Sequence, residues 1–296
     1  MPTIREVADK AGVSPTTVSH IVNNTRFVSD VIRQRVQAAM DELGYRPNTL
    51  ARSLRRGETH TIGLILPDSS NPYFAEVGHT IEATAFELGY SVVLCNSESN
   101  PEKEAFYADL LSKRQVDGII FFAVGDQSHS LQGLLRQNVP VVVVDRDLAE
   151  IEADAVLADN LAGGYLATRH LLEQGHRRIG LIVGPSNVTP SADREIGYRQ
   201  ALDEFGLEPE PALCDQGDFH YQSGQDATRR LLGVANPPSA IFACNDVMAV
   251  GAIRAASAAG VRVPHDLAIV GFEDIELASY TVPSLTTVAQ PKEELG

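Results

Sequence analysis

The chain has 296 residues, a length that predicts two domains with room for a small third. Of these residues 44% are hydrophobic and 21% charged, a composition that predicts a folded protein with a packed core. The three cysteines are far apart in the sequence, which excludes a disulfide framework and any CxxC metal or redox motif. Residues 1–60 carry nine Lys and Arg against six Asp and Glu, whereas residues 61–296 carry 15 against 33. A basic head on an acidic body hints at a nucleic-acid-binding appendage. Neither a secretory signal nor an apolar run long enough to span a bilayer is visible, so we expect a cytoplasmic protein without membrane contact.

The first 46 residues predict three short helices. Thr3 and Glu6 have the spacing of a capping box, and Ser14 followed by Pro15 is typical of a second helix start. Gly12 lies between these two helices, which gives a helix-turn-helix pattern. A third helix is expected between Ser29 as its cap and Gly44 as its end. Its inner side would consist of Val31, Val36, Ala39, Met40 and Leu43.

The second predicted helix carries candidate DNA contacts. If it enters the major groove, its exposed early residues face the bases. These are Pro15, Thr16, Thr17, Ser19 and His20, and Arg26 follows in the loop. Taken alone, each of them is better explained as an ordinary polar residue in the first turn of a helix. The whole set on one short helix favours DNA binding.

Residues 47–60 predict a hinge with a very short basic helix. Asn48 can cap it and Gly57 can end it. Leu54 on this basic helix is a candidate wedge for a minor-groove base step, with Arg55 among the neighbouring cations. The alternative is an ordinary basic linker.

From residue 61 the pattern changes to alternating apolar strands and amphipathic helices. The strands are expected at 61–66, 91–94, 118–123, 139–144, 179–183, 240–243 and 267–270. The helices are expected at 73–88, 102–113, 131–137, 161–174, 194–205, 223–232 and 247–259. This alternation predicts an α/β fold with doubly wound parallel sheets. The region from residue 61 onward has more than 230 residues, which is more than one such sheet usually needs, so we expect two lobes.

Polar and aromatic side chains follow five of the predicted strands. Ligands of open α/β sheets bind beyond the carboxyl ends of the strands, so these positions are candidates for a binding site. Carboxylates, amides, arginines and aromatic rings suit a polyhydroxylated ligand. Each residue alone is more simply a loop cap or a solvated charge, but five strand ends with the same chemistry favour a site.

Signals for catalysis are poor. The chain has no GxxxxGK[ST] loop, no GxGxxG after a strand and no GxSxG elbow. Its eight histidines show no HExxH or HxxxH spacing. We therefore expect no enzyme activity, no cofactor and no metal site.

The chain resembles the LacI/GalR family of bacterial transcription repressors over its whole length. The likeness rests on the following motifs: Thr3-Ile4-Arg5-Glu6-Val7-Ala8, Gly44-Tyr45-Arg46-Pro47-Asn48, Ala51-Arg52-Ser53-Leu54, Asn71-Pro72-Tyr73-Phe74, Asn245-Asp246 and Pro283-Ser284-Leu285-Thr286-Thr287-Val288. Within the family, ribose-type repressors are most similar and purine-type repressors come next.

The resemblance implies a homodimer on a near-palindromic operator in double-stranded DNA, controlled by a small-molecule effector. It implies DNA contacts from Thr16, Thr17, Ser19, His20, Arg26, Asn48, Leu54 and Arg55. It also implies effector contacts from Asn71, Tyr73, Phe74, Asp145, Arg146, Arg194, Phe219, Asn245, Glu273 and Gln290. Asp145, Arg146 and Arg194 resemble sugar-binding residues, which favours a sugar such as ribose over a purine.

The resemblance also implies domain boundaries. Residues 1–46 form the head, 47–60 the hinge, and 61–296 a two-lobed domain like periplasmic sugar-binding proteins. The first lobe is expected at 61–158 plus 288–296, and the second at 159–287. Compared with the family, Pro15 replaces a frequent Thr, Glu273 replaces a usual Asp, and we expect a further C-terminal segment beyond Gly296.

Three alternatives remain at this point. One is a regulator of the same family with a purine corepressor. The second is a stand-alone sugar-binding protein, which the helix-turn-helix pattern disfavours. The third is a sugar-processing enzyme, which the absence of a nucleophile or cofactor motif disfavours.

Overall fold

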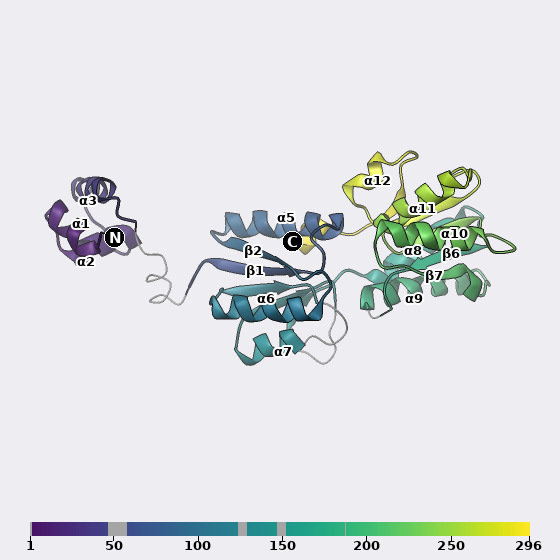
Figure 1. Cartoon of the computed structure of the whole chain (residues 1–296), viewed down its shortest axis with the longest axis horizontal. Helices are drawn as coiled ribbons and strands as arrows, with labels where there is room; N and C mark the ends of the chain where they lie inside the picture. The colour runs from purple at the N-terminus through teal and green to yellow at the C-terminus, as the bar shows by residue number, and fades with distance from the viewer. Residues whose placement is uncertain (1, 47–57, 124–128, 147–151, 187) are drawn as a thin grey trace. The chain divides into compact units, whose positions relative to one another are not determined.

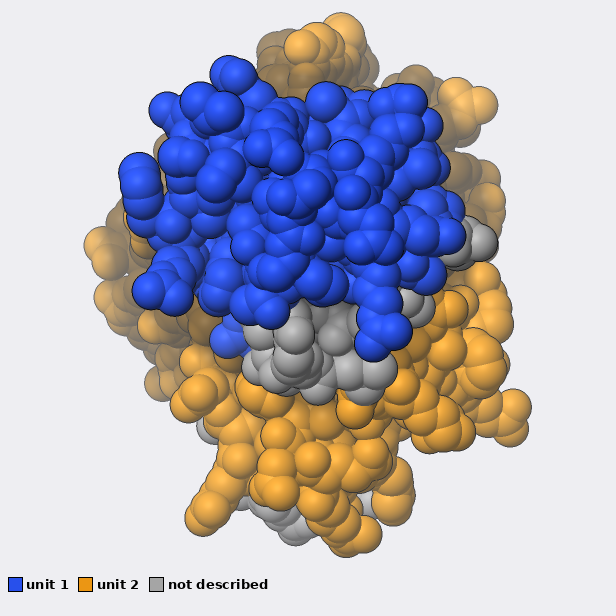
Figure 2. All heavy atoms as spheres, turned by 90° about the vertical axis from the view of Figure 1, so that its left-hand side faces the viewer, with its two compact units in different colours: residues 1–59 blue, residues 60–296 orange. Residues whose placement is uncertain are grey.

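The chain forms two compact units, residues 1–59 and 60–296, in a computed structural model that describes residues 2–46, 58–123, 129–146, 152–186 and 188–296 (Figures 1 and 2). The predicted short hinge helix lies outside the described residues. None of the described helices has the length and apolarity needed to cross a membrane.

The first unit contains the three predicted helices, α1 (Ile4–Ala11), α2 (Pro15–Asn23) and α3 (Asp30–Leu43). Both parts of the predicted capping box on α1 are present, and the Ser14 hydroxyl caps α2 by accepting a hydrogen bond from Thr17 N. Gly12 and Gly44 end α1 and α3 in the left-handed conformation, which glycine adopts without steric cost.

One detail of the predicted third helix is confirmed in position only, and another is wrong. Ser29 occupies the N-cap position of α3, but its side chain makes no capping hydrogen bond. Val31 is 68% exposed, while Ile32 packs against the core cluster of the head. Because Ile32, Val36, Ala39 and Leu43 follow one helical face, Val31 falls outside the apolar stripe.

The first sheet of the second unit is parallel, with strand order β2-β1-β3-β4-β5. Its strands are β1 (Thr61–Leu66), β2 (Ser91–Asn96), β3 (Gly118–Phe121), β4 (Val141–Val144) and β5 (Asp154–Val156). Helix α5 (Pro72–Glu87) lies on one face, and α6 (Pro101–Lys113) and α7 (His129–Arg136) lie on the other (Figure 1).

Strand β1 shows why both faces are covered. Leu64 and Leu66 belong to the core cluster under α5, whereas Ile65 belongs to the cluster under α6 and α7. All three side chains are at most 1% exposed. Successive side chains of a strand point to opposite faces, so an uninterrupted apolar strand must be buried on both.

The second sheet is also parallel, with strand order β10-β9-β8-β6-β7. Its strands are β6 (Ile179–Val183), β7 (Cys214–Gln216), β8 (Ala240–Ala243), β9 (Ala268–Glu273) and β10 (Thr286–Ala289). Its helices are α8 (Asn160–Glu173), α9 (Thr189–Glu204), α10 (Tyr221–Leu232), α11 (Asp246–Ala258) and α12 (Glu276–Tyr280), with the short η1 (Pro211–Leu213) before β7.

The chain passes from the first sheet to the second between β5 and α8, and α13 (Lys292–Leu295) returns to pack against α5. We call the first sheet with α5, α6, α7 and α13 the first lobe, and the second sheet with α8 to α12 the second lobe. Residues 288 and 289 belong to β10 of the second sheet. The expected return to the first lobe at 288 is therefore two residues too early.

Candidate functional site

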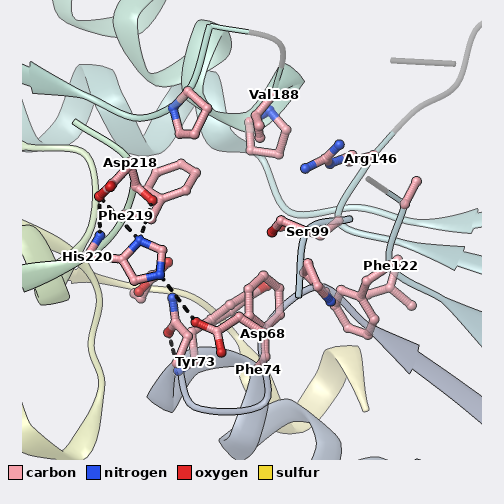
Figure 3. A pocket seen from close by; sticks show the side chains of 18 of the residues that line it. Asp68, Tyr73, Phe74, Ser99, Phe122, Arg146, Val188, Asp218, Phe219 and His220 are labelled. Atoms are coloured by element: carbon pink, nitrogen blue, oxygen red, sulfur yellow. Dashed lines mark hydrogen bonds and ion pairs between the residues drawn. The ribbon is translucent and has the colours of Figure 1, made fainter. Parts of the chain in front are cut away.

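A pocket lies between the two lobes, at the carboxyl ends of the strands (Figure 3). Eight of the ten predicted effector residues line it: Asn71, Tyr73, Phe74, Asp145, Arg146, Arg194, Phe219 and Glu273. Because parallel strands present their carboxyl ends on one side, residues from β1, β4 and β9 meet here although they are far apart in the sequence.

The other two predicted residues, Asn245 and Gln290, do not line this pocket. The Asn245 side chain caps α11 by accepting a hydrogen bond from Met248 N at 2.9 Å, and its Nδ2 donates to the backbone oxygen of Phe219 at 3.3 Å. Gln290 is 5% exposed and follows β10, with its backbone N donating to the backbone oxygen of Glu273 at 3.4 Å. Both residues contact the backbone of pocket residues.

Arg194 is the buried cation of the pocket, with only 2% of its surface exposed. Its Nε donates to Asn160 Oδ1 at 2.9 Å, and its Nη1 donates to the backbone oxygen of Cys244. Helix α9 begins at Thr189, five residues earlier than predicted, so Arg194 lies within the helix and not at its start. Two hydrogen bonds and a helical backbone therefore fix the direction of the guanidinium.

Two buried carboxylates face this cation from different lobes. Burial raises the pKa of Asp145 and of Glu273, and the charge of Arg194 opposes that rise in both. Glu273 Oε1 lies 3.9 Å from Arg194 Nη1. The pair is thus close enough for electrostatic attraction but too far apart for a hydrogen bond.

Several buried polar atoms in this region have no hydrogen-bond partner among the described residues. They are Tyr73 Oη, Asp145 Oδ1, Glu273 Oε2 and both amide atoms of Gln290. Such atoms cost about 1–3 kcal/mol each when nothing satisfies them. The set contains hydrogen-bond donors and acceptors, so it is complementary to a ligand that offers both.

Phe219 is held in an unusual conformation at the second-lobe side of the pocket. Its φ is +69°, and a Cβ placed on Gly184 would lie 2.1 Å from its ring. The ring therefore packs against a strand end that only glycine allows. Positive φ in a non-glycine residue costs free energy, and such residues cluster at ligand-binding positions.

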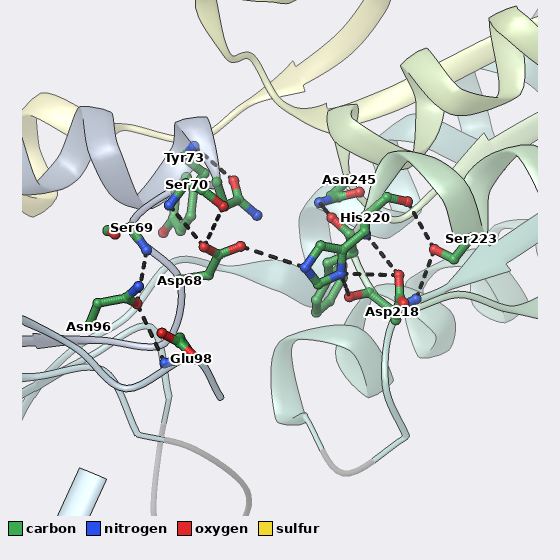
Figure 4. Close-up of polar contacts among 12 residues, drawn as sticks. Asp68, Ser69, Ser70, Tyr73, Asn96, Glu98, Asp218, His220, Ser223 and Asn245 are labelled. Atoms are coloured by element: carbon green, nitrogen blue, oxygen red, sulfur yellow. Dashed lines mark hydrogen bonds and ion pairs between the residues drawn. The ribbon is translucent and has the colours of Figure 1, made fainter. Parts of the chain in front are cut away.

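Two polar side chains that the sequence patterns did not single out meet across the pocket, Asp68 and His220. His220 Nε2 lies 3.6 Å from Asp68 Oδ2, and its Nδ1 lies 3.2 Å from Asp218 Oδ1 (Figures 3 and 4). Asp68 comes two residues after the end of β1, as the predicted site at strand ends requires. His220 follows Phe219, and a lone histidine gave no separate signal.

In the head, the predicted DNA contacts divide by exposure. Thr16 and Arg26 are exposed, whereas Thr17, Ser19 and His20 are partly buried. The Thr17 hydroxyl bonds to that of Ser14 at 2.9 Å, and His20 Nδ1 bonds to Thr25 Oγ1 at 2.9 Å. Asn48, Leu54 and Arg55 lie outside the described residues.

Comparison with known proteins connects both units to one family. Residues 3–48 match the bacterial regulatory proteins of the lacI family, and residues 59–296 match the periplasmic binding proteins and sugar binding domain of the LacI family. The chain belongs to the LacI family. As a LacI-family protein it is a DNA-binding transcriptional repressor with an effector-binding domain, and not an enzyme. The resemblance seen in the sequence is thereby confirmed.

The similarity of this LacI-family chain to individual relatives extends over nearly its whole length. The ribose operon repressor of Escherichia coli strain K12 is 42% identical over 100% of this chain and 90% of that protein. The transcriptional repressor PurR of Serratia proteamaculans strain 568 is 41% identical over 100% of this chain and 87% of that protein. The Lac repressor dimer bound to operator and the anti-inducer ONPF superposes with a TM-score of 0.88 at 32% identity, over 99% of this chain and 89% of that one.

Proposed function

We propose that this repressor responds to a small sugar, with ribose the first candidate, bound in the pocket between the lobes. The observation that carries the proposal is the set of unpartnered buried polar atoms around Arg194, which Tyr73, Asp145 and Glu273 contribute. A pentose offers several hydroxyl groups, each able to donate and accept. The similar ribose operon repressor and the sugar-binding family description of residues 59–296 support the same ligand class.

The proposed roles follow from the chemistry of each side chain. Asp145 and Glu273 accept hydrogen bonds from sugar hydroxyls, and Arg194 and Arg146 donate to sugar oxygens. Phe74 and Phe219 offer aromatic faces to the C–H surface of the ring. Asn71 and Asn245 act through backbone contacts, since Asn71 caps α5 by accepting from Tyr73 N at 3.0 Å. Gln290 does not line the pocket, and it acts through the hydrogen bond from its backbone N to the backbone oxygen of Glu273.

We further propose that the head, residues 1–46, reads an operator half-site. Thr16, Thr17, Ser19, His20 and Arg26 supply its contacts. The hinge, residues 47–60, adds Asn48, Leu54 and Arg55 at the minor groove, and the two lobes form the remaining domain. Because operator DNA is the target, the site of action is the bacterial cytoplasm.

A second copy of this chain is the proposed partner, as in the Lac repressor dimer. Strand β2 lies at the edge of the first sheet, between α5 and α6. Large apolar side chains are exposed on these elements: Phe86, Leu88, Leu94 and Phe106, which we call the edge patch, are 74%, 71%, 52% and 61% exposed. An apolar group of this kind at a sheet edge is typical of an interaction surface.

A purine corepressor is the alternative effector, favoured by the similar PurR and by the aromatic rings of Phe74 and Phe219 in the pocket. Thermal unfolding with ribose, other pentoses, hexoses, hypoxanthine and guanine distinguishes the two. A ligand at about 100 times its Kd stabilises the folded state by roughly 2.7 kcal/mol. Stabilisation by ribose or another sugar supports the proposal. Stabilisation by purines alone contradicts it.

A further inference from the structure

The loop that carries Glu273 out of β9 has a strained backbone. Glu273 and Asp274 have φ values of +107° and +54°, and neither is glycine. Two successive residues in this region persist only where neighbouring groups hold them there. The groups that hold this loop therefore decide where the Glu273 carboxylate lies in the pocket.

Two of these groups come from the first lobe or from the segment that returns to it. Glu76 Oε1 on α5 accepts a hydrogen bond from Glu276 N at 3.0 Å. Lys292 Nζ, at the start of α13, donates to the backbone oxygen of Asp274. Lys292 Nζ also lies 2.6 Å from Glu76 Oε2. One ion pair thus holds two successive peptide groups after Glu273, the one between Asp274 and Ile275 and the one between Ile275 and Glu276.

Two further contacts, both made by Ile275, hold the same loop in place. Asp246 Oδ2 accepts a hydrogen bond from Ile275 N at 2.9 Å. The Ile275 side chain is 1% exposed and belongs to the core cluster of Tyr73 and Val77 on α5. The loop is therefore packed against the first lobe, although its strand belongs to the second.

The ion pair of Glu76 and Lys292 is partly buried, but it does not line the pocket. The side chains of Lys292 and Glu76 are 16% and 31% exposed, and neither residue lines the pocket. A partly buried charge-assisted pair is stronger and less screened by salt than a surface pair. Its effect on a ligand must pass through the backbone of residues 274–276.

We propose that Glu76 and Lys292 are positioning residues for the effector: their ion pair holds the Glu273 carboxylate in the pocket and connects effector binding to α5 of the first lobe. This rests on the proposed function of the pocket. Both residues belong to the first lobe, and their hydrogen bonds to Asp274 and Glu276 reach the loop that follows β9 of the second lobe. Any change of the angle between the lobes on ligand binding therefore acts on these contacts directly.

The test combines Glu76→Gln, Lys292→Met and the double variant, with Glu82→Gln on the exposed side of α5 as the matched control. Ribose affinity is measured by calorimetry at a temperature far below unfolding. We expect Lys292→Met to weaken ribose binding by about tenfold and Glu76→Gln by about threefold, since glutamine keeps the acceptor for Glu276 N. The double variant should bind ribose no more weakly than Lys292→Met does, because the two side chains act as one pair. Lys292→Arg should keep most of the ribose affinity.

Amide hydrogen exchange of the ligand-free protein gives a second readout that does not depend on the effector. Lys292→Met should speed exchange at Ile275 and Glu276 while exchange in β6 and β8 stays unchanged. If ribose binds no form of the protein, the proposed effector fails, and the exchange at these two amides still decides the positioning role. Unchanged exchange, or additive losses of ribose affinity in the double variant, would overturn the proposal.

Discussion

The guanidinium of Arg194 lies over the ring of Phe272, 3.9 Å from the ring centroid. Two adjacent glycines of α8 make this stack possible. A Cβ on Gly163 would lie 2.4 Å from the Phe272 ring, and a Cβ on Gly164 would lie 2.2 Å from the backbone oxygen of Arg194. The close approach of α8 to both residues therefore sets the position of the buried cation.

Replacement of Arg194 by lysine should remove the effector response while the protein stays folded. Lysine keeps the charge but has no planar group to stack on Phe272, and it lacks the fixed fork of donors that points at both Asn160 Oδ1 and the Cys244 oxygen. We expect sugar affinity to fall by at least about tenfold and effector-free operator binding to persist. Titration calorimetry and an operator-binding assay measure the two properties. Arg199→Lys, at an exposed ion pair of the same helix, is the control, and equal sugar affinity in both variants would exclude a role of Arg194 in sugar binding.

Gly164→Ala should destabilise the protein and weaken sugar binding together. The new Cβ can fit only if α8 and α9 move apart, because the atom it meets is backbone. Overpacking of this kind costs about 1–3 kcal/mol. Gly133→Ala in α7 is the matched control, since a Cβ there meets nothing within 4 Å, and we expect it to be neutral or stabilising. Urea unfolding of both variants checks the difference, and equal stabilities would show that the helices can separate freely.

Much of the fold could be predicted because its long elements carry strong local signals. The strand 61–66 has the predicted bounds, and Thr3 and Ser14 cap α1 and α2 as their spacing indicates. The short elements gave no such signal. In β5 all three residues are exposed, and α12 has only five residues, so tertiary pairing and not composition defines them.

The site could be predicted only where the strand-end rule applies. That rule places Asp145 and Glu273 in one pocket from their positions after β4 and at the end of β9. It gives no information on pairs that depend on lobe packing. Glu76 and Lys292 are more than 200 residues apart, and no local pattern connects α5 with α13.

Thr16→Ala and Arg26→Ala should separate base reading from phosphate contact in the head. Both side chains are exposed. Loss of a base contact at Thr16 should weaken operator binding by about 1–3 kcal/mol while binding to scrambled DNA is unchanged. Loss of a phosphate contact at Arg26 should weaken binding to both DNAs. It should also lower the slope of the logarithm of the binding constant against the logarithm of the salt concentration by about one. Fluorescence anisotropy at several salt concentrations measures both effects. Equal losses on both DNAs for Thr16→Ala would contradict a base-reading role.

Leu94→Glu should convert the proposed dimer to a monomer. Leu94 belongs to the edge patch, and a buried unpaired carboxylate in the interface would oppose association. Leu166→Glu on α8 is the matched control, because the two leucines are 52% and 54% exposed. Sedimentation velocity should show a monomer for Leu94→Glu alone, with weaker operator binding. A dimer in both variants would place the interface elsewhere.

Asp246 gives the pH dependence of stability a defined direction. Burial raises its pKa from 3.8 to about 6, although Thr287 Oγ1 and Ile275 N donate hydrogen bonds to it. The folded state therefore holds this proton more tightly than the unfolded state. The resulting stabilisation is fully present below about pH 4, is lost as the pH rises through about 6, and amounts to roughly 2–3 kcal/mol.

Asp246→Asn should remove this dependence, because the amide is neutral and can both accept from Ile275 N and donate to Thr287 Oγ1. Relative to the wild type, the variant should gain free energy of unfolding as the pH is raised from about 4 to about 7. Glu273 and Asp145 titrate in both proteins, so their contributions largely cancel in this difference. Urea unfolding at a series of pH values gives the measurement, with the exposed Asp203→Asn on α9 as the control. A stability difference that stays constant with pH would mean that Asp246 does not bind its proton more tightly in the folded state.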